Sequence, residues 1–228
     1  MRQNHPLSGL MAFAGQSEWR DLFSQLLGKH LRTTLDAFGL PSDTLIKLLG
    51  KQRTATLWGC VLEDLTTCQA GAEGRNILDD YLTTAGKAEP RVNQAYMLSL
   101  RASVMSLYEI VEVIPAATLM VRDAVREKAP VALHRDERMR HWSVGDWVAM
   151  RLLSAGEAHL ATGGLLRLTP QSANTVLEEL HNIAAKLGLR IKDIDDIALR
   201  QCTPVLTQAW LLENLPLPLT RAVETAQC

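Results

Sequence analysis

The chain has 228 residues, of which 47% are hydrophobic, and its formal net charge is -1. That length predicts one domain or two small ones, with enough apolar side chains for a sizeable core. The near-neutral charge excludes a global attraction to nucleic acid or to an anionic membrane, although a local basic patch would suffice for binding. Since no apolar run reaches the roughly 20 residues that cross a bilayer, we expect no membrane association.

The first half of the chain shows helical periodicity. Apolar side chains recur on one helical face from Trp19 onward, whereas residues 1–16 show no period and are expected to form a flexible arm. Gly39, Pro41 and Gly50 are expected to end helices. The predicted helices of this half lie near residues 17–38, 42–49, 54–69, 77–82 and 90–107.

From Tyr108 the pattern changes to the alternation of a β-strand. Gly145 and Gly156 mark turns between further short apolar runs, and the turn at Gly156 is typical of a hairpin. Five short strands in about 60 residues favour a small closed or half-closed antiparallel barrel of the SH3-like or OB-like kind, because closure removes exposed sheet edges. The predicted strands are 108–114, 118–123, 131–134, 147–153 and 159–168.

One of these strands places side chains of opposite character on the same face. Alternation puts Trp147, Ala149 and Arg151 on one side of the sheet. We expect this face to be buried near the start of the strand and solvated near its end. The pattern therefore predicts a buried Trp147 and a solvated Arg151.

The C-terminal part returns to helical periodicity. Pro170 begins a patterned helix that Gly188 ends, and Pro204 begins a last one. An acidic cluster lies between them, and we interpret it as a helix start favoured by the macrodipole rather than as a set of Mg²⁺ ligands. The acidic residues are Asp193, Asp195 and Asp196.

These patterns together predict an α+β protein. A helical N-terminal half precedes a small SH3/OB-like antiparallel β-barrel, and C-terminal helices follow it. The expected organisation is a flexible arm over 1–16, a helical domain over 17–107, a small β-barrel over 108–168, and C-terminal helices over 169–228 that pack on the rest.

The loop between two predicted strands, residues 134–142, holds the sharpest cluster of charged and aromatic side chains. Guanidinium groups fork onto phosphate and indoles stack on bases, so the loop is a candidate nucleic-acid contact. The alternative is a solvated loop in which Asp136 and Glu137 offset the positive charge and the tryptophan lies in the barrel core. The candidate contact residues are Arg135, Arg138, Arg140, His141 and Trp142.

Other motifs give no support for catalysis or for a cofactor. The histidines lack the close spacing of zinc ligands, and no C-x-x-C pair, G-x-S-x-G elbow or P-loop is present. Gly163-Gly164 lacks the lysine and hydroxyl of a phosphate cradle and is interpreted as a bulge or close-approach pair in a strand. Since disulfide staples are not needed at this size, a reducing cytoplasm fits the four cysteines best. They are Cys60, Cys68, Cys202 and Cys228.

Two segments resemble parts of uncharacterised bacterial proteins. The stretch 96–109, YMLSLRASVMSLYE, is similar to a segment that in those proteins leads into a strand and a proline-containing turn, which corresponds here to Pro115. Ala116 replaces the glycine that follows that proline, and the stretch 203–211 resembles their C-terminal end. Some of these proteins carry a SEC-C-type metal knuckle, but this chain has no matching cysteine set, so the resemblance implies no metal here. It implies a bacterial cytoplasmic origin and no established activity.

We therefore expect a non-enzymatic binding module whose ligand is nucleic acid or another protein, with no cofactor. The alternative is a small enzyme whose site is assembled from residues that are distant in the sequence. A deep pocket with convergent titratable groups would favour the enzyme, whereas an open basic barrel face would favour binding.

Overall fold

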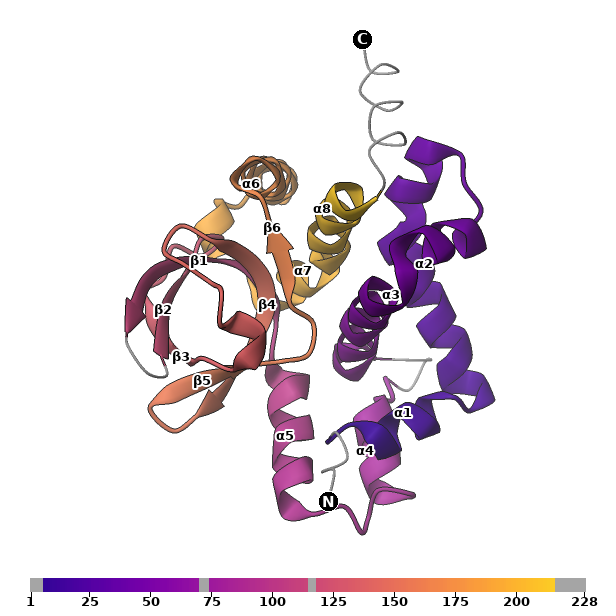
Figure 1. Ribbon diagram of the computed structural model, residues 1–228. Coiled ribbons are helices and arrows are strands. Elements are labelled where there is room, and N and C mark those ends of the chain that lie inside the picture. The colour runs from indigo at the N-terminus through magenta and orange to yellow at the C-terminus, as the bar shows by residue number, and fades with distance from the viewer. Residues whose placement is uncertain (1–5, 70–73, 115–117, 216–228) are drawn as a thin grey trace.

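The computed structural model describes residues 6–69, 74–114 and 118–215 and has a mixed α+β fold (Figure 1). The N-terminal helices and the six-stranded sheet lie side by side, and the C-terminal helices complete the fold (Figure 1). Among the described residues, no helix is both long enough and apolar enough to cross a membrane.

The helical half follows the predicted boundaries closely. Gly39, with a φ of 60°, ends one helix in the left-handed conformation that glycine adopts without strain. Gly50, with φ 75° and ψ 166°, interrupts the next, so the predicted break is present as a kink within α3. The helices of this half are α1 Ser8–Ala14, α2 Ser17–Phe38, α3 Ser42–Thr67, α4 Ile77–Thr83 and α5 Arg91–Ala102.

The flexible arm expected over residues 1–16 is wrong for its described part, because α1 occupies most of it. Leu7, Leu10 and Ala14 repeat at helical spacing and are buried in the main core. The glycines at each end of this short run hide the period in the sequence. Residues 1–5 lie outside the described part of the chain.

The sheet begins sooner than predicted, because α5 ends at Ala102 and β1 starts at Met105. The predicted strand 159–168 is two strands, interrupted around Gly163-Gly164. The turn at Gly156 joins β4 to β5 as the predicted hairpin. The strands are β1 Met105–Ile114, β2 Thr118–Asp123, β3 Val131–His134, β4 Trp147–Ala155, β5 Ala158–Ala161 and β6 Leu166–Leu168.

The strand order is β1-β2-β3-β5-β4-β6, and β1 pairs in addition with β4. Five strands are thus linked in a cycle, β1 to β2, β3, β5, β4 and back to β1. Five strands cannot all alternate in direction around a cycle. Among the described strands, the parallel pairing is that of β3 with β5, at Leu133 and His159. The expectation of an entirely antiparallel sheet is therefore wrong at this one pairing; all the others are antiparallel.

The C-terminal helices begin where the sequence predicts. The Thr169 side chain caps α6, and Asp195 accepts a hydrogen bond from the Ala198 amide at 2.8 Å to cap α7. The helix-start interpretation of the acidic cluster is thereby confirmed for Asp195. These helices are α6 Pro170–Lys186, α7 Asp196–Gln201 and α8 Thr203–Asn214. The predicted tail after residue 215 and the turn at 115–116 lie outside the described residues.

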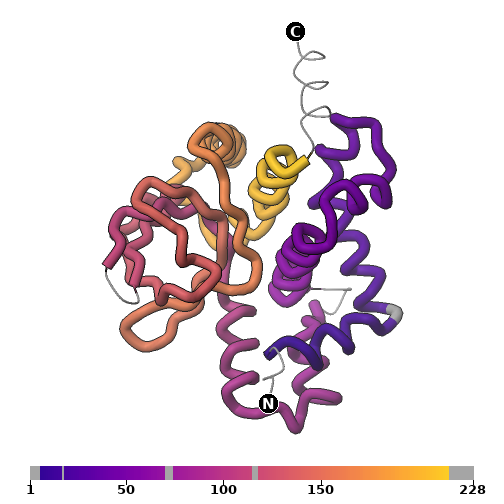
Figure 2. Tube along the Cα trace, viewed as in Figure 1, coloured from indigo at the N-terminus to yellow at the C-terminus, as the bar shows by residue number. Residues whose placement is uncertain are grey.

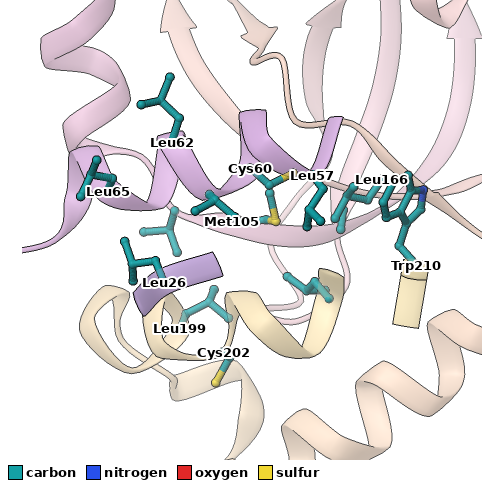
Figure 3. Packing of buried hydrophobic residues seen from close by; sticks show 14 of the residues in the cluster. Leu26, Leu57, Cys60, Leu62, Leu65, Met105, Leu166, Leu199, Cys202 and Trp210 are labelled. Atoms are coloured by element: carbon teal, nitrogen blue, oxygen red, sulfur yellow. The ribbon is translucent and has the colours of Figure 1, made fainter. Parts of the chain in front are cut away.

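Two hydrophobic cores meet at the sheet. The main core joins the N-terminal helices, one face of β1, β4 and β6, and α8, which lies between the sheet and α2 and α3 (Figure 2). Leu57 and Cys60 of α3 lie near Met105 of β1 and Leu166 of β6, with Trp210 of α8 beside them (Figure 3). A second, smaller core joins side chains of β1, β2, β3 and β4 with Met139 and Trp142.

Candidate functional site

The predicted loop keeps its basic side chains close together but uses several of them internally. The Arg135 guanidinium donates to the backbone carbonyls of Met139, at 3.2 Å, and of Arg140. Arg138 pairs with Asp136, and its Nη1 donates to the Thr162 carbonyl at 2.8 Å. These two arginines therefore tie the loop to itself and to the end of β5.

Electrostatics within the loop agree with this pairing. Partial burial alone would raise the pKa of Asp136, but hydrogen bonds from Arg138 outweigh it, and the pKa is lowered. The Trp142 side chain is only 7% exposed and belongs to the smaller core. Arg140 and His141 are exposed and contact each other, with Arg140 Nε 3.0 Å from His141 Nε2. Of the five predicted residues, Arg138, Arg140 and His141 are exposed, and Arg138 is already paired with Asp136.

A buried ionic network, which sequence reasoning missed, joins the helical half to the sheet. Arg151 on β4 has no solvent exposure, which corrects the expectation that it is solvated. Its guanidinium pairs with Asp64 of α3, lies with Nε 3.7 Å from Glu63, and donates to the Ser103 carbonyl at 3.1 Å. Trp147, on the same face, is only half-buried against the main core, so the face is more buried at the end of the strand than at its start, the reverse of the prediction. Alternation placed Arg151 on the correct face, but that face stays buried because α3 covers it.

The network continues from Asp64 into helices α2 and α8 through His30. Thr207 donates its hydroxyl proton to the Pro204 carbonyl at 3.0 Å, so its oxygen accepts from His30 Nδ1 at 2.8 Å. His30 Nε2 lies 3.0 Å from an Asp64 carboxylate oxygen, which also accepts. His30 therefore links Asp64 of α3 to Thr207 of α8 through its two ring nitrogens.

The second carboxyl of the network, Glu63, fastens the loop between β5 and β6. It accepts hydrogen bonds from the Thr162 hydroxyl at 2.8 Å and from the Gly164 amide at 3.0 Å. Burial raises the pKa of Glu63, although Arg151 opposes the shift. A Cβ on Gly164 would lie 2.8 Å from the Cys60 sulfur, so the predicted close approach is confirmed for Gly164, although the glycine pair lies between two strands and not within one.

The arrangement of Thr207, His30 and Asp64 has the partners of a nucleophilic triad but not its accessibility. Thr207 has no solvent exposure, and its hydroxyl proton is held by backbone carbonyls. A nucleophile must reach a substrate carbonyl and pass its proton to the base. The network therefore supports the fold and does not form a hydrolytic site in this conformation.

An accessible apolar groove lies between α1, α2 and α3, and we call it the Trp58 groove. Its main cavity measures about 520 Å³, and a second cavity of about 400 Å³ continues along α3, with Ala55 and Trp58 lining both. Trp58 is 50% exposed and Met11 is 57% exposed, which is unusual for side chains of this size. Apolar residues from all three helices line the main cavity, namely Leu7, Met11, Ala14, Phe23, Ala55, Trp58 and Leu62.

The accessible charges around the Trp58 groove are basic. Arg20 lines the main cavity, and Lys47 and Lys51 line its continuation. Glu63 also borders the main cavity, but it is 2% exposed and engaged in the buried network. Helical periodicity in the sequence does not signal this groove, because Trp58 lies one turn before the buried Leu62 on the same helix.

Comparisons with known proteins add no further assignment. No family model, curated protein or solved structure matches the chain. Within the described ranges, no three His, Cys, Asp or Glu side chains are arranged to hold a metal ion.

Proposed function

We propose that the chain is a non-enzymatic protein-binding module whose Trp58 groove takes an amphipathic, acidic helix of a partner protein. The observation that carries the proposal is the half-exposed Trp58 at the centre of an apolar groove with a basic rim. Large exposed apolar patches mark interaction sites, and tryptophan is enriched among the residues that dominate binding energy.

A helical partner suits this groove better than an extended one. The walls are helices whose backbone groups bond internally, so no sheet edge offers hydrogen bonds to an extended peptide. A helix satisfies its own backbone and can place apolar anchors at i, i+3, i+4 and i+7 along a groove. The kink at Gly50 continues the groove past Trp58, since the side chains on both sides of the kink line the second cavity.

The rim charge favours an acidic partner. Arg20 has only a long, exposed contact of 3.9 Å to Asp21, and Lys47 and Lys51 are exposed. Acidic residues beside the partner's apolar stripe would meet these cations, which speeds encounter and selects orientation more than it adds affinity. The chain's overall charge of -1 would not attract such a partner, so the local rim is what matters.

The nucleic-acid alternative is supported by less of the molecule. Arg135 and Arg138 are held by carbonyls and by Asp136, and Trp142 is buried, which leaves Arg140 and His141 to meet a phosphate. The small-barrel interpretation of the sheet belongs to the proposal as well. It is supported by the pairing of β1 with both β2 and β4, so that the hydrogen-bonded series β1-β2-β3-β5-β4 leads back to β1.

The proposal is tested with a labelled helical peptide of about 15 residues, roughly four turns, with leucines on one face and glutamates on the other. Fluorescence anisotropy should show binding, and replacing the glutamates by lysines should weaken it. Gly59 provides a blocking variant, because a Cβ there meets no atom within 4 Å and a larger side chain enters the groove. Gly59→Leu should weaken binding at least about tenfold, which is about 1.4 kcal/mol.

The matched control is Gly28→Leu on α2, another helical glycine whose Cβ would meet nothing within 4 Å and which does not line the groove. Both substitutions replace a helical glycine with a better helix former and should leave the fold intact. Equal peptide affinity of the Gly59→Leu and Gly28→Leu proteins, or no peptide binding by the unmodified chain, would contradict the proposal.

A further inference from the structure

A separate cavity, apart from the Trp58 groove, is lined by elements that are far apart in the sequence. It measures about 320 Å³ and lies between α2, the end of α3, and the junction of α7 and α8. Its volume is at the small end of the range for ligand pockets, which suits a metabolite-sized molecule. The lining residues are Leu26, Lys29, His30, Asp64, Thr67, Cys68, Arg200, Gln201 and Pro204.

The cavity holds two cationic side chains that lack anionic partners. Among the described residues, Lys29 has no ion pair, and Arg200 Nε is buried with no hydrogen-bond partner. The only bond from the Arg200 guanidinium is a long one, 3.5 Å from Nη2 to the Ala102 carbonyl. A buried guanidinium nitrogen without a partner costs free energy that an incoming acceptor would recover.

The carboxylate that lines the cavity already has two partners. Asp64 faces Arg151 with one oxygen and His30 with the other, so it does not compensate Lys29 and Arg200. Lys29 and Arg200 both line the cavity together with Cys68. The cavity therefore carries an excess of positive charge next to the apolar surfaces of Leu26 and Pro204.

We propose that this cavity binds a small organic oxyanion, with its charged head between Lys29 and Arg200 and its apolar body against Leu26 and Pro204. Arginine can fork onto two oxygens of a carboxylate or phosphate, and lysine adds a point charge. This site is separate from the Trp58 groove and shares no lining residue with it. The inference therefore stands whether or not the groove binds a partner.

Cys68 provides a direct readout, because it lines the cavity and is half-buried, whereas Cys60 and Cys202 are buried elsewhere. Burial and the nearby Asp64 raise the pKa of Cys68, so alkylation by the neutral reagent iodoacetamide is followed at mildly alkaline pH. Peptide mapping by mass spectrometry gives the rate at Cys68 alone. The probes are butyrate, butyl phosphate, inorganic phosphate and the uncharged butyramide.

An occupied cavity should shield the thiol. We expect butyrate or butyl phosphate to slow Cys68 alkylation at least about threefold at saturation, and the better of the two identifies the preferred head group. Inorganic phosphate should protect less, because it lacks the apolar body, and butyramide should not protect. Lys29→Gln should abolish the protection, whereas Arg32→Gln, an exposed cation on the same helix, should leave it unchanged.

Several results would overturn the inference. These are equal protection by butyramide, no protection by either charged probe, or undiminished protection in the Lys29→Gln protein. Arg200→Gln is a second variant with the same expected loss. Arg200 is half-buried, so Arg200→Gln can impair folding, whereas Lys29 is exposed. If the Arg200→Gln protein does not fold, the Lys29→Gln protein decides the test.

Discussion

Replacing Arg151 with methionine should destabilise the protein strongly, because this side chain is the fully buried cation between two buried carboxyls. Methionine keeps a long apolar stem but removes the charge. Breaking a buried ion pair costs about 3–5 kcal/mol, since the remaining charge is left without compensation. The Ser103 carbonyl, which accepts from Arg151 at 3.1 Å, loses its donor as well. We expect the free energy of unfolding to fall by about 4 kcal/mol, a large part of the roughly 5–15 kcal/mol of a typical domain.

Urea denaturation followed by circular dichroism measures this loss as a change in midpoint at a constant slope. A second substitution tests the cause. Glu63→Gln in the Arg151→Met background removes one uncompensated carboxyl and leaves Asp64 with His30, so it should restore about 2 kcal/mol. Glu63→Gln alone is the control. A loss below about 1 kcal/mol for Arg151→Met, or no recovery in the double variant, would refute the reasoning.

Three further outcomes test other parts of the account. Gly164→Ala should cost about 1–3 kcal/mol of unfolding free energy, because its Cβ would lie 2.8 Å from the Cys60 sulfur; unchanged urea stability would contradict the close approach. Burial raises the pKa of Glu63, so the folded state holds more protons than the unfolded state between the ordinary and the raised pKa. The free energy of unfolding should therefore fall as pH rises through that range. Glu63→Gln should flatten this dependence in urea titrations from about pH 4 to about pH 8. Trp142→Ala should cost about 3–5 kcal/mol and Trp58→Ala about 1 kcal/mol or less, as thermal unfolding would show, and a reversed order would contradict their placement.

Local chemistry in the sequence predicts the elements of this fold well. The helix breaks at Gly39 and Gly50 are predicted correctly, because glycine adopts a positive φ without strain whatever its surroundings. The alternation from Tyr108 and the turns at Gly145 and Gly156 likewise place most strands. Helix α1 is missed because its run is short and carries glycines, and because its burial depends on packing against α2 and α4.

The candidate sites depend on contacts that no local pattern contains. Arg151 meets Asp64 across 87 positions and His30 meets Thr207 across 177, so neither pairing leaves a spacing to recognise. Exposure is equally non-local. Trp142 fills a core, whereas Trp58 is half-exposed beside a groove, and the neighbours of each residue in the sequence do not distinguish them. The 134–142 loop is predicted as a contact surface because its charges are adjacent in the sequence, but backbone carbonyls hold Arg135 and Asp136 holds Arg138.

Nuclear magnetic resonance of the tryptophan indole groups tests the central claim most directly. The acidic amphipathic peptide is titrated into nitrogen-labelled protein, and the indole signals are assigned by substituting one tryptophan at a time. The account predicts that the Trp58 indole signal shifts most, since that ring is 50% exposed in the groove, and that the Trp142 signal stays in place. Largest shifts at Trp142 and in the 135–141 loop, with an unmoved Trp58 signal, would contradict the assignment of the groove as the binding site.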